Sequence, residues 1–582
     1  MTTYVPPVDD MVRMLELTGY GEIASWERFA HAQPDDVAEL LRELGRFATT
    51  ELLPLDGVGD REGSRLVDGR VTTPTGFREA YARYVAAGWG GVAFEPEFGG
   101  GGLPWAVAAA MQEILAAVNV AFSLCPMLTQ GAVELLGTWG TEAQKAEHLA
   151  KLVSGEWTGT MNLTEPDAGS DVGAVRTSAV PRDDGSWSVS GTKIFITWGD
   201  HDLADRIIHL VLARTPGAPV GTKGISLFLV PDRIGDERNG VRCLSLEHKL
   251  GIHASPTAVL QFDGAQGELV GELHGGMAAM FTMMNQARLS VGIEGLGLGE
   301  RAYQTALRYA VERRQGRRSG AAGSVAIVEH PDVRRMLLTM RAEVDATRAL
   351  IYTTAHAIDG ARWHPSPEVR ADCAAMASLL VPLAKAWPTD VVNAVTSTAV
   401  QVHGGAGYIE ETGVAQLLRD ARIAAIYEGT NGIQAIDLVL RKVSMGDTDP
   451  LPNLLAGMAT AADALRATPG CEPAGDALAH ARAQVEDTAR WIVEHRGTHP
   501  DDVLAVATPF LDALARTVAG LVLSRELVGP LAASSTPRRR TAARFFLTQR
   551  LLATPDLRRL TAEGVAPFDE FLDQIVQPVG SS

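Results

Sequence analysis

The residue best placed to do chemistry is a glutamate, Glu428, in the run Tyr427–Asn431. It follows the apolar stretch Ile423–Ile426 and precedes Gly429. Glycine lets a backbone approach a ligand or adopt a positive φ. A carboxylate beside apolar residues is partly desolvated, which suits a general base. An exposed glutamate that caps a helix has the same local sequence, and for an arbitrary Glu-Gly-Thr that second interpretation is the better one.

A second glycine-rich turn, His403–Gly407, lies upstream of this glutamate. A short amphipathic segment separates the two turns. Its apolar stripe is placed to face a core, and its charges come from three residues. The stripe comprises Val414, Leu417, Leu418, Ile423, Ala424 and Ile426, and the charged residues are Arg419, Asp420 and Arg422.

Other stretches carry polar groups suited to a ligand. Met161–Val172 combines hydroxyls and glycine after a strand, and such a turn can bind a polar ring edge or a phosphate. An ordinary surface turn is the more common explanation. Asn285 and Arg288 lie three apart and share one helix face, as a surface polar pair also does. Gly295–Gly299 lies inside a helical pattern without a preceding strand, so it is not interpreted as a dinucleotide fingerprint.

Composition limits the class of protein. The chain has 582 residues, 46% of them hydrophobic, and a net charge of −18. No window of about 18 uninterrupted apolar residues predicts a membrane span, and the first residues do not resemble a signal peptide. Four scattered cysteines fit a reducing compartment, and histidine spacing predicts no metal site. The acidic balance argues against nucleic acid, although Arg538–Arg540 is a short basic run.

Periodicity along the chain changes from helical to β-rich and back to helical, which predicts an α+β, mostly α fold. Short β-rich runs at Ser186–Thr197, Ile207–Leu212, Ile225–Val230 and Ala258–Phe262 favour a small barrel or sandwich. We predict an N-terminal helical domain over 1–156 and a central β-domain over 157–276. A C-terminal four-helix bundle follows over 277–445, and an additional helical domain over 446–582.

At Ala421–Gln434 the sequence resembles the C-terminal active-site motif of the flavin-dependent acyl-CoA dehydrogenases. Met161–Val172 resembles the Thr-Glu-Pro-x-Ala-Gly-Ser-Asp signature of the same family, and Phe195–Thr197 its flavin-contacting strand. The α, β, α order is also that of the family. Residues 80–442 carry the resemblance, and the tail after Met445 is similar to that of a longer bacterial branch.

The resemblance implies a role for individual residues. Glu428 is the expected catalytic base. Arg313 is expected to clamp the flavin pyrophosphate across a dimer interface, although Gln315 and Gly316 replace the more usual Thr and Phe. Gly432 and Asn285 are further departures. The expected FAD contacts are Met161, Leu163, Thr164, Ser170, Phe195, Thr197, Arg313, Gln401, Gly404, Gly405 and Thr430. The expected substrate contacts are Ser170, Asn285, Arg288, Tyr427 and Gly429.

The activity implied is α,β-dehydrogenation of an acyl-CoA thioester to a trans-2-enoyl-CoA, with electrons passed to an electron-transfer flavoprotein. A homodimer or dimer of dimers in the cytoplasm is expected, without nucleic acid or integral membrane association. Two alternatives stay open. One is an acyl-CoA oxidase on the same fold. The other is a flavoprotein that binds nucleic acid through its extra C-terminal domain, supported only by Arg538–Arg540.

Overall fold

The computed structural model describes residues 4–318, 323–553 and 555–575. These fall into two compact units, which are described separately. Unit 1 contains residues 4–8, 31–301 and 408–423, and unit 2 contains 9–30, 302–407 and 424–575. The sequence predicts a break in the long helical pattern at Gly316–Gly323, and this stretch lies partly outside the described residues. The predicted division into four domains stays a prediction.

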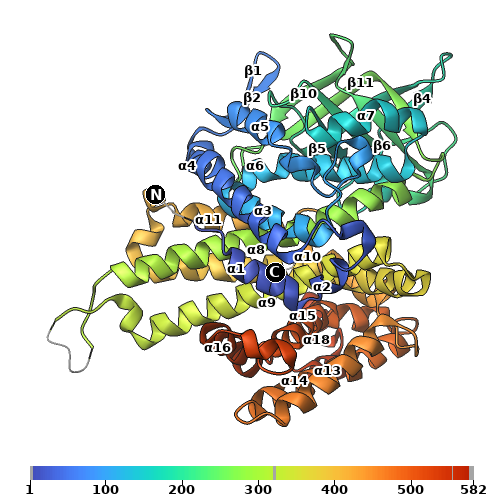
Figure 1. Cartoon of the computed structure of the whole chain (residues 1–582). Helices are drawn as coiled ribbons and strands as arrows, with labels where there is room; N and C mark the ends of the chain where they lie inside the picture. Colours follow the sequence, from blue (N-terminus) through green and yellow to red (C-terminus); the bar gives the residue numbers. More distant parts are fainter. Residues whose placement is uncertain (1–3, 319–322, 554, 576–582) are drawn as a thin grey trace, which may run out of the picture. The chain divides into compact units, whose positions relative to one another are not determined.

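Unit 1 combines a helical part with a β-domain (Figure 1). The helices are α3 (Pro34–Phe47), α4 (Leu53–Glu62), α5 (Phe77–Ala86), α6 (Trp105–Trp139), α7 (Glu142–Ser154), α11 (Val414–Ala421) and the first part of α8 (Gly276–Glu312). A small antiparallel hairpin, β1 (Arg65–Val67) with β2 (Arg70–Thr72), interrupts the predicted helical region. The sequence analysis missed this hairpin, which is too short for a period to emerge.

Helix α6 is buried almost along its whole length, because its residues are apolar on every side. The sequence predicts a helix over Trp105–Ala117, whereas α6 continues to Trp139 across a break in the helical backbone at Asn119, where φ is −161° and ψ is 88°. The Asn119 Oδ1 accepts a hydrogen bond from the Phe122 N–H at 3.0 Å, so the side chain starts the next helical stretch. The predicted helix therefore covers only the part of α6 before this break.

The β-domain is a closed barrel with two appended strands. Strands β5, β4, β6 and β7 follow one another and β11 pairs with both β5 and β7, while β10 extends β11 and β3 runs parallel to β6. The bounds are β3 (Trp157–Asn162), β4 (Ser178–Pro181), β5 (Trp187–Thr197), β6 (Arg206–Arg214), β7 (Ile225–Pro231), β8 (Arg233–Ile234), β9 (Glu237–Arg238), β10 (Val241–Leu246) and β11 (Thr257–Val270).

The barrel core explains why these runs became strands. Val189, Val211, Phe228, Leu260 and Phe262 belong to one buried cluster drawn from β5, β6, β7 and β11. Strand β6 is buried on both faces, as expected of a continuous apolar run. The predicted fold class, α+β and mostly helical with a small β-domain, is confirmed.

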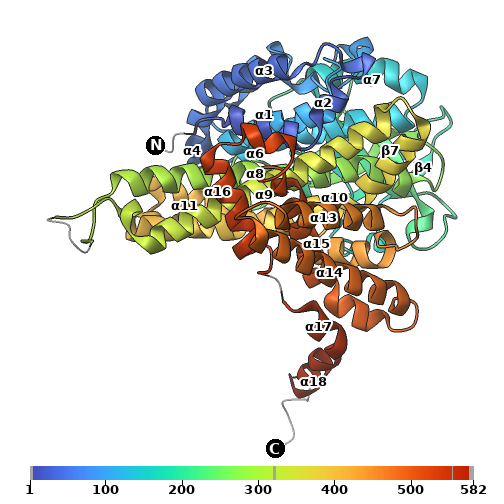
Figure 2. The same cartoon turned by 60° about the horizontal axis from the view of Figure 1, so that its bottom comes forward.

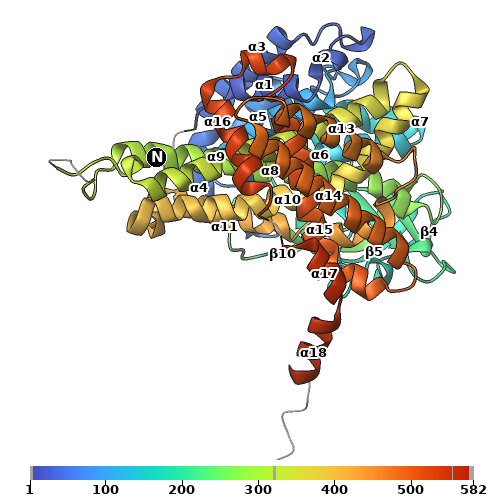
Figure 3. The same ribbon diagram turned by 90° about the horizontal axis from the view of Figure 1, so that it is seen from below.

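Unit 2 is helical. Helices α9 and α10 pack against each other along their length, and α12 packs on α10 (Figure 3). Beyond them, α15 packs on α9, α12 and α14, while α13 packs on α14. The bounds are α2 (Tyr20–Ile23), α9 (Pro331–Trp363), α10 (Pro367–His403), α12 (Asn431–Asp437), α13 (Pro450–Arg466), α14 (Glu472–His495), α15 (Pro500–Ser524), α16 (Pro537–Phe545), α17 (Leu557–Glu563) and α18 (Ala566–Ile575).

Helix α18 extends away from α13–α16 (Figure 2). Helix α17 packs on α14 and α15 through the buried Leu557. Two helices, α6 and α15, are long and apolar enough to cross a membrane by composition. Their apolar windows are 94% and 78% buried, as in the core helices of a globular protein.

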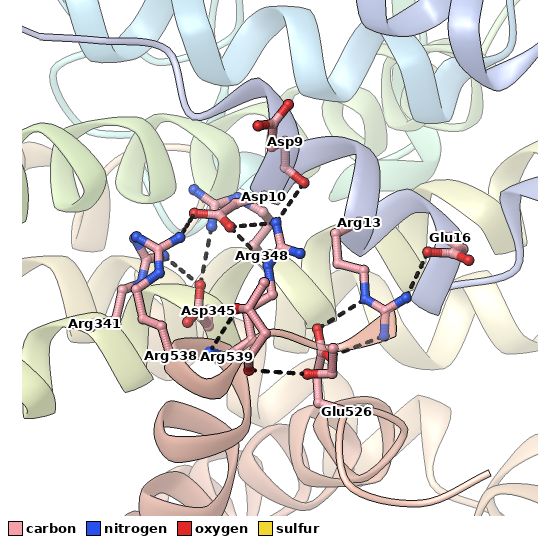
Figure 4. Close-up of polar contacts among 12 residues, drawn as sticks. Asp9, Asp10, Arg13, Glu16, Arg341, Asp345, Arg348, Glu526, Arg538 and Arg539 are labelled. Atoms are coloured by element: carbon pink, nitrogen blue, oxygen red, sulfur yellow. Dashed lines mark hydrogen bonds and ion pairs between the residues drawn. The ribbon is translucent and has the colours of Figure 1, made fainter. Parts of the chain in front are cut away.

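One polar cluster fastens the N-terminal helix α1 (Val8–Leu17) to the last part of unit 2 (Figure 4). Arg13 donates through Nε and Nη2 to the two carboxylate oxygens of Glu526, at 3.1 and 2.9 Å, and both side chains are almost fully buried. One turn earlier, the Asp10 carboxylate accepts from Arg538 at 2.6 Å and from Arg539 at 2.8 Å. The basic run suspected of binding nucleic acid thus contributes two of its arginines to this cluster.

The charge around Asp10 sets its pKa. Burial alone would raise the pKa of this carboxyl, but Arg341, Arg348, Arg538 and Arg539 outweigh burial and lower it from 3.8 to about 2. The contribution to stability is therefore fully present above the ordinary value near 3.8. It is lost as the pH falls from there toward 2.

We expect Asp10→Asn to lower the free energy of unfolding at pH 7 by roughly 2 kcal/mol, since one pKa unit corresponds to about 1.4 kcal/mol. Urea unfolding followed by circular dichroism measures it, and the difference from wild type should shrink only below about pH 4. The control is Asp487→Asn, which removes a carboxylate from an exposed pair with Arg558 and should change little. Equal effects of the two variants would contradict the assignment.

Candidate active site

In unit 1, the end of β3 carries three of the predicted cofactor contacts. Met161 is half-buried in β3, and Leu163 and Thr164 follow the strand. The Thr164 carbonyl accepts from the Ile194 N–H at 2.9 Å, so this segment is fastened to β5. The fourth, Ser170, is exposed in the turn that follows.

A buried ion pair lies directly behind this segment. Lys193 is fully buried, and its Nζ donates to the Leu163 carbonyl at 3.1 Å and to Glu165 Oε1 at 2.8 Å. Burial lowers the pKa of Lys193 to about 8, against the pull of Glu165. Burial acts to raise the pKa of Glu165, but Lys193 and the donors from Thr177 and Arg176 hold it below its usual value.

Phe195 is presented outward by an irregularity in β5. Going from Ala258 to Leu260, β11 advances two residues while β5 moves from Ile196 to Lys193, so β5 has one extra residue. Phe195 adopts φ +58° and is 57% exposed. A left-handed backbone is costly for an aromatic residue and occurs most often at functional sites. The flanking Thr197 is half-buried at the same strand end.

The pair predicted for the substrate tunnel is formed on α8. The Arg288 Nη1 donates to Asn285 Oδ1 at 3.4 Å, as the spacing of three residues predicts. Arg288 is buried, unlike a surface polar pair, and its guanidinium carbon lies 5.8 Å from the centre of the Phe281 ring. An arginine buried beside an aromatic ring is suited to hold a fixed position.

In unit 2, Glu428 lies in a strained turn between the end of η10 (Arg422–Ala425) and α12. Its φ is +55°, and Gly429 follows at +83°. The Gln434 Nε2 donates to the Glu428 carbonyl at 3.2 Å, while Thr430 Oγ1 accepts from the Ile433 N–H and caps α12. Tyr427 is half-buried in the same turn.

The turn is tied to α10 through Asn431. Its Nδ2 donates to Asp390 Oδ1 at 2.8 Å and to the Ala386 carbonyl at 3.1 Å. Its Oδ1 accepts from Lys385 Nζ at 2.9 Å, and that lysine is fully buried. One amide thus fixes the segment that follows Glu428.

The remaining predicted contacts gather at the C-terminal end of α10. Tyr309 stacks on His403 with 4.3 Å between ring centres, which brings the α8 turn before Arg313 beside the Gly404 turn. Arg313 and Gln401 are exposed. Nothing lies within 4 Å of where a Cβ would stand on Gly404 or Gly405, so their backbone is open to a ligand. Gln401 also lines a pocket of about 280 Å³ with Arg335, Met336, Thr339, Ser397 and Thr398.

Each unit, taken by itself, offers groups that suit one part of a flavin dinucleotide. Unit 1 offers an exposed aromatic ring on a fixed strand end, which can pack on a tricyclic ring. Unit 2 offers an arginine, a glutamine and open glycine backbone, the donors that bind phosphate and ribose. Within the described residues, no cluster of three or more His, Cys, Asp or Glu is arranged for a metal ion.

Helix α11, which leads toward Glu428, is anchored by a buried carboxylate. Asp420 Oδ1 accepts from the Ile252 N–H at 2.5 Å, and Oδ2 accepts from Gln416 at 3.3 Å. Burial, then Asp56 and Asp60, raise the pKa of Asp420 to about 7. Sequence reasoning counted Asp420 among the charges of the segment and missed its burial, for which the three-residue spacing from the buried Leu417 was the available signal.

Sequence reasoning also missed Lys193, Glu165 and Asn431 as supporting residues. Glu165 and Asn431 stand inside motifs singled out from the sequence, and Lys193 lies two residues before the Phe195–Thr197 motif. A lysine in a strand is usually solvated, and only the tertiary packing of β3 on β5 reveals that this one is not.

Four family models match consecutive parts of the chain. "Acyl-CoA dehydrogenase, N-terminal domain" matches residues 34–156, "Acyl-CoA dehydrogenase, middle domain" matches 160–265, and "Acyl-CoA dehydrogenase, C-terminal domain" matches 274–443. "Acetyl-CoA dehydrogenase C-terminal like" matches 454–568. Together they account for most of the chain, the additional C-terminal helices included.

A 3-methylmercaptopropionyl-CoA dehydrogenase from Ruegeria pomeroyi is 46% identical over 520 residues, which are 88% of this chain and 88% of that protein. Butyryl-CoA dehydrogenase from Megasphaera elsdenii is similar in structure, with a TM-score of 0.57 and 29% identity over 69% of this chain and 96% of that chain. Caenorhabditis elegans ACDH-11 in complex with C11-CoA has the same fold, with a TM-score of 0.81 and 21% identity over 100% and 96% of the two chains.

We expect the pH dependence of stability to change in Asp420→Asn. With a pKa of about 7 in the fold and 3.8 ordinarily, the wild-type carboxyl takes up a proton on folding between about pH 4 and pH 7. Its contribution is fully present below about pH 4 and lost as the pH rises through 7. Asn mimics the protonated acid, so the variant should match wild type near pH 4 and exceed it at pH 8 by about 4 kcal/mol. Thermal unfolding measures this, with Asp487→Asn as control. A variant less stable at pH 8 contradicts it.

Proposed function

The chain belongs to the acyl-CoA dehydrogenase family, and we propose that it dehydrogenates an acyl-CoA thioester with Glu428 as the base. Membership confirms the family, the enzyme class and FAD as the cofactor expected from the sequence. One observation carries the proposed role of Glu428. It is the carboxylate of the Tyr427–Asn431 turn, held at a positive φ in a backbone that Gln434 and Asn431 fix.

The residues of this chain would divide the work as follows. The Glu428 carboxylate takes the proton from the carbon next to the thioester, and the Glu428 N–H hydrogen-bonds to the thioester oxygen as negative charge develops there. Gln434 and Asn431 keep the turn from relaxing to an ordinary φ. When bound, FAD would supply the acceptor for the hydride of the adjacent carbon, so that a trans-2-enoyl-CoA would be the product.

In unit 1, the residues that would contact FAD are Met161, Leu163, Thr164, Ser170, Phe195 and Thr197. In unit 2 they are Arg313, Gln401, Gly404, Gly405 and Thr430, with Arg313 reaching the pyrophosphate across a dimer interface, as the resemblance implies. Asn285, Arg288, Ser170, Tyr427 and Gly429 would contact the substrate. A homodimer or dimer of dimers, as the resemblance implies, and a cytoplasmic location are part of the proposal.

The names of two relatives indicate which acyl-CoA substrates to test first. The bacterial relative at 46% identity is named for a short thioether acyl-CoA, and the structural relative at 29% for butyryl-CoA. We propose short acyl-CoAs first, the thioether included. The nucleic-acid alternative loses its support, because Arg538 and Arg539 are engaged by Asp10.

We expect Glu428→Gln to bind FAD as wild type does but to lower the rate of flavin bleaching by acyl-CoA by roughly 10²–10⁴-fold, the usual contribution of a general base. Anaerobic stopped-flow absorbance with a series of acyl-CoAs measures it. Glu411→Gln is the control, since this glutamate is exposed in the same stretch of sequence. Normal bleaching in Glu428→Gln would show that another group is the base.

The electron acceptor is tested separately. We propose an electron-transfer flavoprotein as the acceptor, and we expect turnover with a purified electron-transfer flavoprotein to exceed turnover with O₂ by a wide margin. Product and hydrogen peroxide are measured in parallel. Peroxide formed in equal amount to the enoyl-CoA, without need of the flavoprotein, would identify an oxidase instead.

A further inference from the structure

The two flavin-facing segments of unit 1 are joined by the buried pair of Lys193 and Glu165. We propose that this pair positions the cofactor, holding the ends of β3 and β5 as one rigid cradle. The proposal rests on the proposed function, because the flavin contacts of Leu163, Thr164 and Phe195 are part of it. Lys193 and Glu165 act through these neighbours and are positioning residues.

Three consecutive residues after β3 are each fastened to β5 by a hydrogen bond from Lys193 or Ile194. The Leu163 carbonyl accepts from Lys193 Nζ at 3.1 Å, and the Thr164 carbonyl accepts from the Ile194 N–H at 2.9 Å. Glu165 accepts from Lys193 at 2.8 Å through its side chain. A segment fixed at three successive residues has little freedom to change its direction.

The second carboxylate oxygen extends the cradle to the following loop. Glu165 Oε2 accepts from the Arg176 N–H at 2.7 Å, and Oε1 also accepts from the Thr177 N–H at 3.0 Å. Farther along the barrel, the Thr177 carbonyl accepts from the Arg214 N–H at 2.8 Å. The loop that contains Ser170 is therefore closed by Glu165, which lies at its beginning and accepts hydrogen bonds from Arg176 and Thr177 at its end.

Phe195 depends on the same lysine. It stands two residues after Lys193 in β5, at the extra residue of the bulge, with φ +58°. A bulge redirects a side chain only while its neighbours keep their register. Lys193 fixes the register here, because its side chain attaches β5, just before the bulge, to the Leu163 carbonyl at the end of β3.

The chemistry of the pair favours orientation over stability. A buried ion pair is often no more stabilising than apolar residues of the same volume, whereas the loss of one partner is strongly destabilising. Apolar residues, however, make no directional hydrogen bonds that could fix the course of the loop. An ammonium aimed at one carbonyl and a carboxylate that accepts from two backbone N–H groups define where the loop lies.

The experiment separates positioning from stability with three variants: Lys193→Met, Glu165→Gln and the double variant. Each is purified as the full chain, stripped of FAD and titrated with FAD by fluorescence. The visible absorption and circular dichroism of the bound flavin, and the melting temperature of the apoprotein, are recorded alongside. Arg301→Met is the matched control, because it breaks another buried pair of unit 1, with Asp56 at 2.8 Å.

We expect Lys193→Met to weaken FAD binding by roughly 10–100-fold, the range found when groups that orient metal ligands are removed, and to alter the flavin circular dichroism. The double variant should recover apoprotein stability, since no uncompensated charge is left buried. Its FAD affinity should stay low, because the ammonium is still missing from the Leu163 carbonyl. Arg301→Met should lose stability and keep its FAD affinity.

Wild-type affinity and flavin spectrum in Lys193→Met or in the double variant would overturn the proposal, and so would equal losses of affinity in Arg301→Met. If Lys193→Met does not fold, the double variant alone decides. If the wild-type protein and the variants bind FAD equally well, only the proposed positioning role of the pair is rejected. A wild-type protein that fails to bind FAD rejects the proposed function itself.

Discussion

The structure depends on holding two residues in a backbone conformation that their side chains disfavour. Phe195 and Glu428 are two of the six non-glycine residues with positive φ within the described residues, at +58° and +55°. Each such position costs on the order of 1–3 kcal/mol and persists only when its surroundings fix it. The neighbours of both residues correspondingly make several hydrogen bonds that fix the backbone.

The two units solve this problem with different chemistry. Around Phe195 the fixing groups are a strand register, a bulge and a buried ion pair. Around Glu428 they are the side-chain amides of Asn431 and Gln434, both of which bond to backbone carbonyls. An amide donates and accepts at once, so Asn431 can satisfy the buried Lys385 and still hold the turn. In both places a buried lysine takes part. Lys193 donates to the Leu163 carbonyl and to the Glu165 carboxylate, and Lys385 donates to the side-chain oxygen of Asn431.

Much of the fold could be predicted from the sequence, because long periodic runs dominate it. The sequence predicts a helix over Ser366–Val402, and α10 spans Pro367–His403. Strand β11 was expected only over Ala258–Phe262, since Asp263, Gly264 and Gly267 are turn residues. The strand nevertheless continues to Val270 because a bulge after Phe262 absorbs the irregularity. Motif residues could be recognised by resemblance, whereas the residues behind them could not. From the sequence, charged residues such as Lys193 and Asp420 are expected to be exposed to solvent. Both are buried in the structure because of tertiary packing.

The additional C-terminal helices also help to hold the turn that contains Glu428. Helix α15 packs directly on α12, the helix that Thr430 caps after the Glu428 turn. It is fastened by charge, since Glu343 on α9 accepts from Arg516 of α15 at 3.1 Å and from Arg550 at 2.8 Å. Arg516 is also held by Asp512 at 3.0 Å, and burial raises the pKa of that carboxyl. A short helix such as α12, with seven residues, has little stability of its own. Packing on α10 and α15 supplies it, so the added helices reach the turn of the candidate base through the helix that this turn begins.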